Sequence, residues 1–159
     1  MCGIIGWKSN TQRVNENIIR KMADAIAHRG PDGEGFYYSN DGSLCLAHKR
    51  LAIIDPENGH QPMKSLDEEL VITFNGAIYN FLELRRELVS LGHPIKSYSD
   101  TEVLIYAYKQ WGEKCLDRLN GMFSFVIHDK RKKILFGARD RLGEKPFYYF
   151  YNKKEFVFA

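Results

Sequence analysis

Hydrophobic residues recur along this chain with two different spacings, and each spacing predicts one type of element. Helical spacing runs through 14–28 and 81–91 and begins again near Asp100. Strand-like apolar runs lie at 4–5, 36–38, 43–54, 70–75, 122–128, 134–139, 147–151 and 155–158. The apolar face predicted for the first helix comprises Val14, Ile18, Ile19, Met22, Ala25 and Ile26.

Turn and capping residues separate these segments. Asn40-Asp41-Gly42 predicts a hairpin between two strands, and the basic run 130–133 predicts a solvated hairpin tip between two others. Asn80 is the predicted N-cap of the second helix, and Ser99 with Glu102 predicts a capping box at the start of the third. Helices inserted between groups of hairpins predict an α+β fold, in which helices cover antiparallel sheets.

Composition narrows the class of protein. With 159 residues, 44% hydrophobic and 27% charged, the chain is predicted to form one globular domain with a substantial core. No apolar stretch reaches the roughly 20 residues that cross a bilayer, and no secretory signal is visible, so we expect no membrane association and a cytoplasmic location. The net charge of +3 comes from intermixed acidic and basic residues, which argues against nucleic-acid binding.

The three cysteines, Cys2, Cys45 and Cys115, form neither a CxxC pair nor an even set. Cys45 lies in a strand-like apolar run and Cys115 beside Leu116 in a helical turn, so both are predicted to be buried as small hydrophobic residues. We therefore expect reduced thiols, with no disulfide framework and no zinc site. The histidines show no ligand spacing either, and no metal is expected.

Cys2 follows Met1 directly, and this position is the most informative chemical feature of the chain. Removal of Met1 would place a thiol and an α-amine on one residue. An α-amine ordinarily titrates near pH ~8, so it can take up the proton of the thiol at neutral pH. While Met1 remains attached, the same nitrogen is an amide and cannot act as a base. The alternative is that the Met-Cys start arose by chance.

Three further segments carry the residue types that attack on an amide requires. Asn75 and Gly76 offer a side-chain amide and a backbone N–H as oxyanion donors, although Asn-Gly is also the commonest tight-turn dipeptide. Arg50 presents a planar guanidinium that suits a carboxylate, and Asp100 presents a carboxylate that suits an ammonium group. Each charge also has a structural explanation: one of the neighbouring residues Lys49 and Arg50 is expected to be only a surface charge, and Asp100 at a helix start would cap the helix or compensate its dipole.

Motifs along nearly the whole chain resemble the class II, N-terminal nucleophile, glutamine amidotransferase domain of glutamine-hydrolysing asparagine synthetases. They are CGIIG at 2–6, HRGPDGEG at 28–35, HKRLAIID at 48–55, GHQPM at 59–63, FNGAIYN at 74–80, SDTEVL at 99–104, LNGMFSFVIHD at 119–129 and ARDRLGEKPFYY at 138–149. The resemblance implies that 1–159 is one amidotransferase domain. It also implies a four-layer sandwich, with two antiparallel sheets between outer helix layers.

The resemblance also implies roles for individual residues. Cys2 would be the nucleophile, and its own α-amine the general base. Asn75 and Gly76 would form the oxyanion hole. Arg50 would bind the α-carboxylate of L-glutamine, and Asp100 its α-ammonium group. The remaining substrate-binding positions implied by the resemblance are Leu51, Ile53, Ile54 and Ala77.

The implied reaction is hydrolysis of L-glutamine to glutamate and ammonia through a γ-glutamyl thioester on Cys2. In the family, the ammonia passes to a C-terminal synthetase domain that uses ATP and magnesium and is absent from this chain; no cofactor is expected in 1–159. The chain ends inside an apolar strand-like run, which predicts that it is part of a longer protein. A homodimer is an open alternative to a monomer.

Two positions depart from the family pattern. Ala77 stands where the family usually has a glutamate that helps to receive the substrate's ammonium group, so we expect weaker glutamine binding or a different amide donor. Glu144 stands at a usually apolar position, and a contact to the missing domain is one explanation. Two alternative functions stay open: an amidotransferase domain serving a different acceptor, and a catalytically silent regulatory module.

Overall fold

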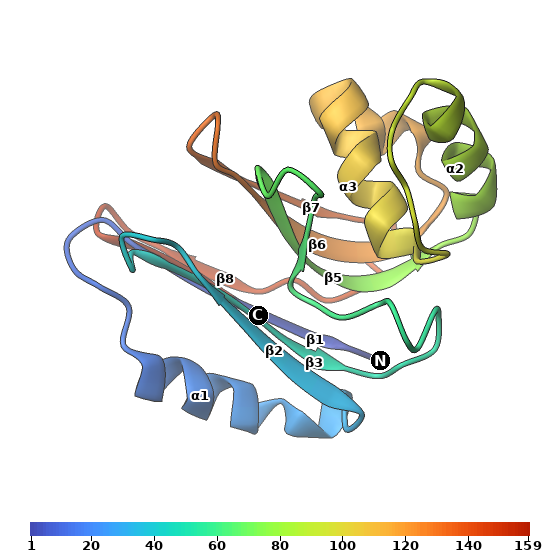
Figure 1. Ribbon diagram of the computed structural model, residues 1–159. Helices are drawn as coiled ribbons and strands as arrows, with labels where there is room; N and C mark the ends of the chain where they lie inside the picture. Colours follow the sequence, from blue (N-terminus) through green and yellow to red (C-terminus); the bar gives the residue numbers. More distant parts are fainter.

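The computed structural model describes residues 1–159 and contains two antiparallel sheets that pack face to face (Figure 1). The first sheet comprises β1 (Gly3–Ser9), β2 (Gly33–Tyr38), β3 (Leu44–Arg50), β8 (Tyr149–Tyr151) and β9 (Glu155–Phe158), in the order β2-β3-β1-β9-β8. The second comprises β4 (Met63–Lys64), β5 (Leu70–Ile78), β6 (Gly121–Asp129) and β7 (Ile134–Arg139), in that order.

Helices cover the outer face of each sheet (Figure 1). The helix α1 (Glu16–Ala25) lies on the five-stranded sheet, whereas α2 (Phe81–Ser90) and α3 (Asp100–Trp111) lie on the four-stranded sheet. Two 3-10 helices, Ala27–Arg29 and Gly112–Arg118, follow α1 and α3. The predicted α+β class and the four-layer arrangement are therefore confirmed.

Apolar clusters fill the spaces between the layers. One cluster joins the four-stranded sheet to α2 and α3, where Ile72 and Leu104 are fully buried. Another lies between the two sheets and includes Val71 from β5. Cys45 and Cys115 are both completely buried, which confirms their prediction as small hydrophobic core residues.

The first helix is shorter than predicted, and its predicted buried face is confirmed in part. α1 begins after Asn15, whose side chain accepts hydrogen bonds from two backbone N–H groups of the first turn. Ile19 of the predicted face is buried, and Val14, Met22 and Ile26 pack in the same cluster. Ile18 and Ala25 are exposed and Ala23 is buried instead, because the position of the sheet decides which edge of the apolar stripe is covered.

The capping predictions are correct in part: Ser99 and Asn80 occupy the predicted N-cap positions of α3 and α2, but the predicted side-chain bonds are incomplete. Ser99 caps α3, but Glu102 accepts the backbone N–H of Ser97 at 2.7 Å and makes no bond to Ser99. Asn80 makes no cap bond to α2; its side chain accepts the backbone N–H of Asn120 at 3.0 Å. This bond ties the start of α2 to the segment before β6, a partner that is distant in sequence.

Two strands end at different residues than predicted. β3 stops at Arg50, because the chain then turns through a loop in which Asp55 has a φ of 44°. β5 continues beyond Asn75 to Ile78, because β6 pairs with its whole length and Asn75 lies opposite Ser124. The alternative of a tight turn at Asn75-Gly76 is therefore wrong.

Candidate active site

The amino-terminal end of β1 lies beside the loop that follows β3, and this places Cys2 between two backbone segments. The backbone nitrogen of Leu51 lies 3.3 Å from the Cys2 Sγ. The Leu51 carbonyl oxygen accepts a hydrogen bond from the Cys2 thiol, with 3.5 Å between oxygen and sulfur. On the other side, Arg29 Nε donates to the carbonyl oxygen of Cys2 at 3.0 Å. The nucleophile predicted from the sequence is therefore held at a defined position.

A pocket of about 190 Å³ opens beside Cys2. This is room for roughly six water molecules at ~30 Å³ each, the scale of a single amino acid. All nine site residues predicted from the sequence lie in its wall, although Ile53 is also largely exposed. The complete lining is Met1, Cys2, Arg50, Leu51, Ile53, Ile54, Gly59, Gln61, Phe74, Asn75, Gly76, Ala77, Ser99, Asp100, Thr101, Met122 and Lys145.

Gly76 offers a backbone N–H at the open edge of β5. Alternate N–H groups of a strand point to opposite edges, and β4 covers only a short part of the edge that faces away from β6. On that edge Phe74 donates to Gln61 Oε1 at 2.6 Å, and Ile78 donates to Asp100 Oδ2 at 3.1 Å. Gly76 lies between these two residues, so its N–H points into the pocket.

The side chain of Asn75 supplies a second donor. It lies on the same face of β5 as Thr73, whose hydroxyl donates to the Ala47 carbonyl oxygen of the facing sheet. Asn75 is buried and makes no side-chain hydrogen bond within the protein, so its amide is available to a ligand. Gly76 is required on packing grounds as well, because a Cβ there would lie 2.2 Å from the Met122 carbonyl oxygen.

Arg50 lies at the end of β3 and is buried, with 8% of its surface exposed. Its Nη1 donates to the Pro56 carbonyl oxygen at 2.7 Å, and its Nη2 to that of Asp55 at 2.8 Å. These bonds fix the guanidinium group while leaving further N–H donors for a carboxylate. Lys49 is equally buried, so the prediction that one of these two residues is only a surface charge is wrong.

Asp100 is buried at the first residue of α3. Burial raises its pKa to about 6, although hydrogen bonds from the backbone N–H groups of Ile78 and Thr101 oppose the rise. Ser99 is the N-cap, so capping does not explain Asp100. The carboxylate stands in the same pocket as the Arg50 guanidinium, an arrangement that matches the two charges of a free α-amino acid.

Several lining residues were not singled out from the sequence. Gln61 Oε1 accepts a hydrogen bond from the Phe74 N–H, and Gln61 Nε2 donates to Thr101 Oγ1 at 3.3 Å. Gln61 therefore connects β5 to α3 in the pocket wall. Glu144, which was singled out, is exposed, whereas the next residue, Lys145, is buried in the pocket wall. The sequence carried no signal for this difference, because it depends on how the chain turns after β7.

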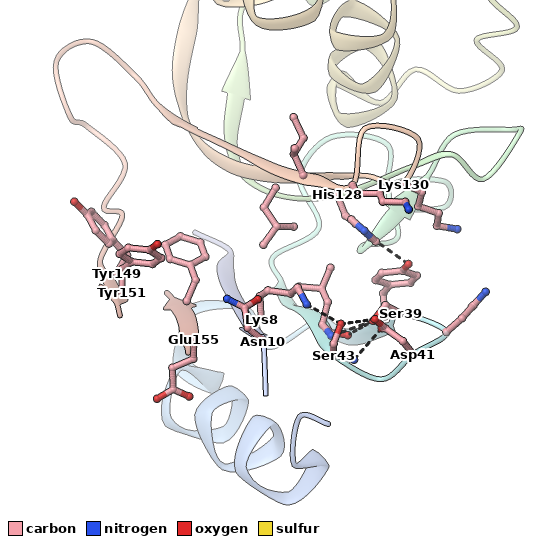
Figure 2. A pocket seen from close by; sticks show the side chains of 17 residues that line it. Lys8, Asn10, Ser39, Asp41, Ser43, His128, Lys130, Tyr149, Tyr151 and Glu155 are labelled. Atoms are coloured by element: carbon pink, nitrogen blue, oxygen red, sulfur yellow. Dashed lines mark hydrogen bonds between the residues drawn. The ribbon is translucent and has the colours of Figure 1, made fainter. Parts of the chain in front are cut away.

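A larger cavity of about 920 Å³ lies at the other end of β1 (Figure 2). It includes Lys8, six residues and therefore roughly 20 Å along the strand from Cys2. His128 Nδ1 and the Tyr37 hydroxyl lie 3.3 Å apart in its wall. No cysteine lines this cavity, so the thiol chemistry belongs to the smaller pocket.

No set of three or more His, Cys, Asp or Glu side chains is arranged to hold a metal ion. None of the helices has the length and apolar character that crossing a membrane requires.

The family model described as a glutamine amidotransferase domain matches residues 1–159. This chain therefore belongs to the glutamine amidotransferase domain family, as its motifs predicted.

Curated relatives narrow the comparison to asparagine synthetases. The chain is 42% identical to asparagine synthetase [glutamine-hydrolyzing] 3 of Bacillus subtilis, over 100% of this chain and 26% of that protein. It is 42% identical to asparagine synthetase [glutamine-hydrolyzing] 3 of Arabidopsis thaliana, over 93% of this chain and 25% of that protein. A putative asparagine synthetase of Methanocaldococcus jannaschii is also 42% identical, over 100% of this chain and 34% of that protein. The chain spans about a quarter to a third of the length of these relatives.

Solved structures support the fold. The glutamine phosphoribosylpyrophosphate amidotransferase from B. subtilis, complexed with ADP and GMP, matches with a TM-score of 0.82 at 20% identity, over 99% of this chain and 41% of that chain. A structure described as the allosteric regulatory enzyme of purine biosynthesis matches with a TM-score of 0.81 at 20% identity, over the same shares. At this identity the likeness concerns the fold alone.

Proposed function

We propose that this domain hydrolyses L-glutamine to L-glutamate and ammonia through a γ-glutamyl thioester on Cys2. One observation carries the proposal: a single amino-acid-sized pocket contains the thiol, two oxyanion donors, a guanidinium group and a carboxylate. The glutamine α-carboxylate binds Arg50 and the α-ammonium group binds Asp100. The γ-carboxamide then extends toward Cys2.

The chemistry begins when the α-amine of processed Cys2 takes the proton of its own thiol. The thiolate forms a bond to the carboxamide carbon, and the resulting oxyanion accepts hydrogen bonds from Asn75 Nδ2 and the Gly76 N–H. The protonated amine then gives its proton to the leaving nitrogen, which departs as ammonia and leaves the thioester.

Water completes the cycle by the reverse sequence of proton transfers. The neutral amine takes a proton from water, the hydroxide attacks the thioester carbon, and the carbon–sulfur bond breaks. Glutamate leaves and the thiolate regains its proton. Because the base is the Cys2 nitrogen, the proposal requires that Met1 be removed.

The ammonia has a proposed destination outside this chain. The relatives are named as asparagine synthetases and are three to four times as long, so we assign the ATP and magnesium chemistry to a further, synthetase domain. No step in the 1–159 domain needs a cofactor. We place the reaction in the cytoplasm, where thiols remain reduced.

The first test is labelling of the processed protein with a γ-electrophilic glutamine analogue, followed by intact and peptide mass spectrometry. The proposal expects one adduct, on the Cys2 peptide, that excess glutamine prevents. The Cys2→Ser variant is the matched control and should remain unlabelled. Processed protein that stays unlabelled at Cys2 would instead support the silent-module alternative. Ammonia release from glutamine, measured in the same samples, tests turnover.

A further inference from the structure

Lys145 is a buried lysine in the wall of the Cys2 pocket, and it has no carboxylate partner. Only 4% of its surface is exposed, and no acidic oxygen lies within 4.0 Å of its Nζ. A buried ammonium group normally pairs with a carboxylate because desolvation is costly. The other buried lysine, Lys49, does so, with Glu34 at 2.5 Å. Packing alone therefore does not explain Lys145.

The side-chain nitrogen of Lys145 instead contacts the residue that must be removed. Lys145 Nζ lies 2.8 Å from the Met1 Sδ, and the thioether is a weak acceptor. Removal of Met1 takes away this contact and creates the α-amine of Cys2 in the same pocket wall. The ammonium group of Lys145 and the newly formed base then line the same pocket.

The backbone of Lys145 is held by contacts that do not involve Met1. Its N–H donates to Asp140 Oδ2 at 3.0 Å, and the N–H of Glu144 donates to the other carboxylate oxygen at 2.9 Å. Its carbonyl oxygen accepts Arg139 Nε at 2.6 Å. The position of Lys145 is therefore expected to persist after processing.

Charges of both signs lie near Cys2. The cations are Arg29, which donates to the Cys2 carbonyl oxygen, Arg50 and Lys145. The carboxylates are Asp100 in the pocket wall, Asp140, which accepts the Lys145 N–H, and Asp32, which accepts the Ala52 N–H. Nearby positive charge disfavours the protonated form of an amine. We propose that the Lys145 ammonium group keeps the α-amine of processed Cys2 in its neutral, proton-accepting form.

This inference rests on the proposed function, since it assigns Lys145 a positioning role toward the general base. A general base acts best when its pKa lies near the working pH. A unit charge within the same pocket, partly screened by solvent, is expected to shift the pKa of the amine by about one unit, which changes the neutral fraction below the pKa about tenfold.

The test is a pH titration of the processed protein labelled with [13C]cysteine and alkylated at the Cys2 thiol, so that the Cys2 Cα shift reports only the α-amine by NMR. Burial raises the thiol pKa values of Cys45 and Cys115 to about 12, so their signals stay constant between pH 6 and 9. In Lys145→Met we expect the pKa of the Cys2 α-amine to rise by about one unit. Lys145→Arg and the exposed control Lys153→Met should leave it unchanged.

The kinetic readout should move with the titration. The acidic limb of kcat/KM for glutamine should shift by the same amount in Lys145→Met, so that activity at pH 6.5 falls about tenfold while the alkaline plateau is retained. A merely structural role would lower the plateau without moving the limb.

Each outcome decides between the proposals. An unchanged α-amine pKa in Lys145→Met, or in Lys145→Gln if the first variant does not fold, overturns the inference. A native α-amine that titrates at or above its ordinary value near pH ~8 overturns it without any variant. A shifted α-amine in a protein that releases no ammonia keeps the inference and rejects the proposed glutaminase function.

Discussion

Gly59 leaves the space that the Arg50 guanidinium group occupies. A Cβ on residue 59 would lie 2.5 Å from Arg50 Nη2 and 2.9 Å from the Asp55 carbonyl oxygen, closer than packed atoms approach. The glycine of the GHQPM motif is therefore explained by the residue that is proposed to bind the substrate carboxylate, although the two belong to different motifs in the sequence.

Gly59→Ala is expected to displace the Arg50 guanidinium group. Loss of a hydrogen bond to a charged group costs about 1.5 kcal/mol, so KM for glutamine should rise about tenfold with a smaller change in kcat. Steady-state kinetics check this. Gly137→Ala, where the nearest atom is 3.5 Å from the added Cβ, is the control and should behave as the native protein. If KM in Gly59→Ala equals that of the native protein, Arg50 does not contribute to substrate binding as proposed.

Asn75→Ala should lower kcat about 100- to 1000-fold and change KM little, because its amide is proposed to bind the oxyanion and not the ground-state substrate. Single-turnover measurement of ammonia release isolates this step. Asn17→Ala, an exposed change on α1, is the control. If kcat falls only a few fold in Asn75→Ala, the oxyanion is stabilised by Gly76 and other donors and not mainly by Asn75.

Ala77 lies in the pocket wall with Asp100, and it leaves that carboxylate to receive the ammonium group without a second carboxylate beside it. Ala77→Glu should strengthen glutamine binding and lower KM about tenfold, the effect of one added charge-assisted hydrogen bond. Ala77→Gln has nearly the same shape without the charge and should not reproduce the gain. Equal Michaelis constants for the native protein and Ala77→Glu would reject this account.

The buried carboxylate of Asp100 is expected to lower the free energy of unfolding at neutral pH. Its pKa is about 6 in the folded protein, against an ordinary 3.8, so the folded state binds more protons between these values. Its contribution to the free energy of unfolding therefore falls by about 3 kcal/mol as pH rises from 4 to 7. Asp100→Asn cannot ionise and should gain that amount relative to the native protein over this range, while losing glutamine binding. Denaturant unfolding at both pH values measures the difference, and a constant difference would contradict it.

His48 should make the fold sensitive to acid. The Thr73 hydroxyl donates to the Ala47 carbonyl oxygen, so His48 Nδ1 donates to Thr73 Oγ1 at 3.3 Å. Burial, with a smaller effect of the nearby Arg50 charge, lowers the His48 pKa from 6.5 to about 3. The unfolded chain therefore binds a proton more readily below pH 6.5, and stability falls with pH.

Between pH 6.5 and 4.5 the free energy of unfolding should fall by about 2 kcal/mol because of His48. His48→Asn keeps a donor near the Nδ1 position and removes the titration, so its stability should depend less on pH by that amount, even though its smaller side chain lowers stability at neutral pH. The exposed His28→Asn is the control. Parallel pH curves for native and His48→Asn protein would assign acid sensitivity to other groups.

Local sequence determined much of this molecule. Strand-like apolar runs predicted the paired strands β6 and β7; in β6 the run is continuous because helices cover one face and the other sheet covers the opposite face. Residue type identified Cys2, Arg50 and Asp100 as candidates, because a thiol, a guanidinium group and a carboxylate have few substitutes in amide chemistry. The motifs that contain these residues indicated the family, because they occur along the chain in the family's order and at the family's spacing.

The tertiary structure decided what depends on distant neighbours. Gly76 offers a free N–H because β4 is only two residues long and leaves the edge of β5 open, a fact about another strand. The buried face of α1 was selected by the sheet, and Lys145, not Glu144, entered the pocket because Asp140 and Arg139 hold the loop after β7. The contacts of β4 with β5 and of α1 with the sheet depend on other elements, and those of the loop after β7 depend on its three-dimensional turn, so spacing and residue type along the chain do not encode them directly.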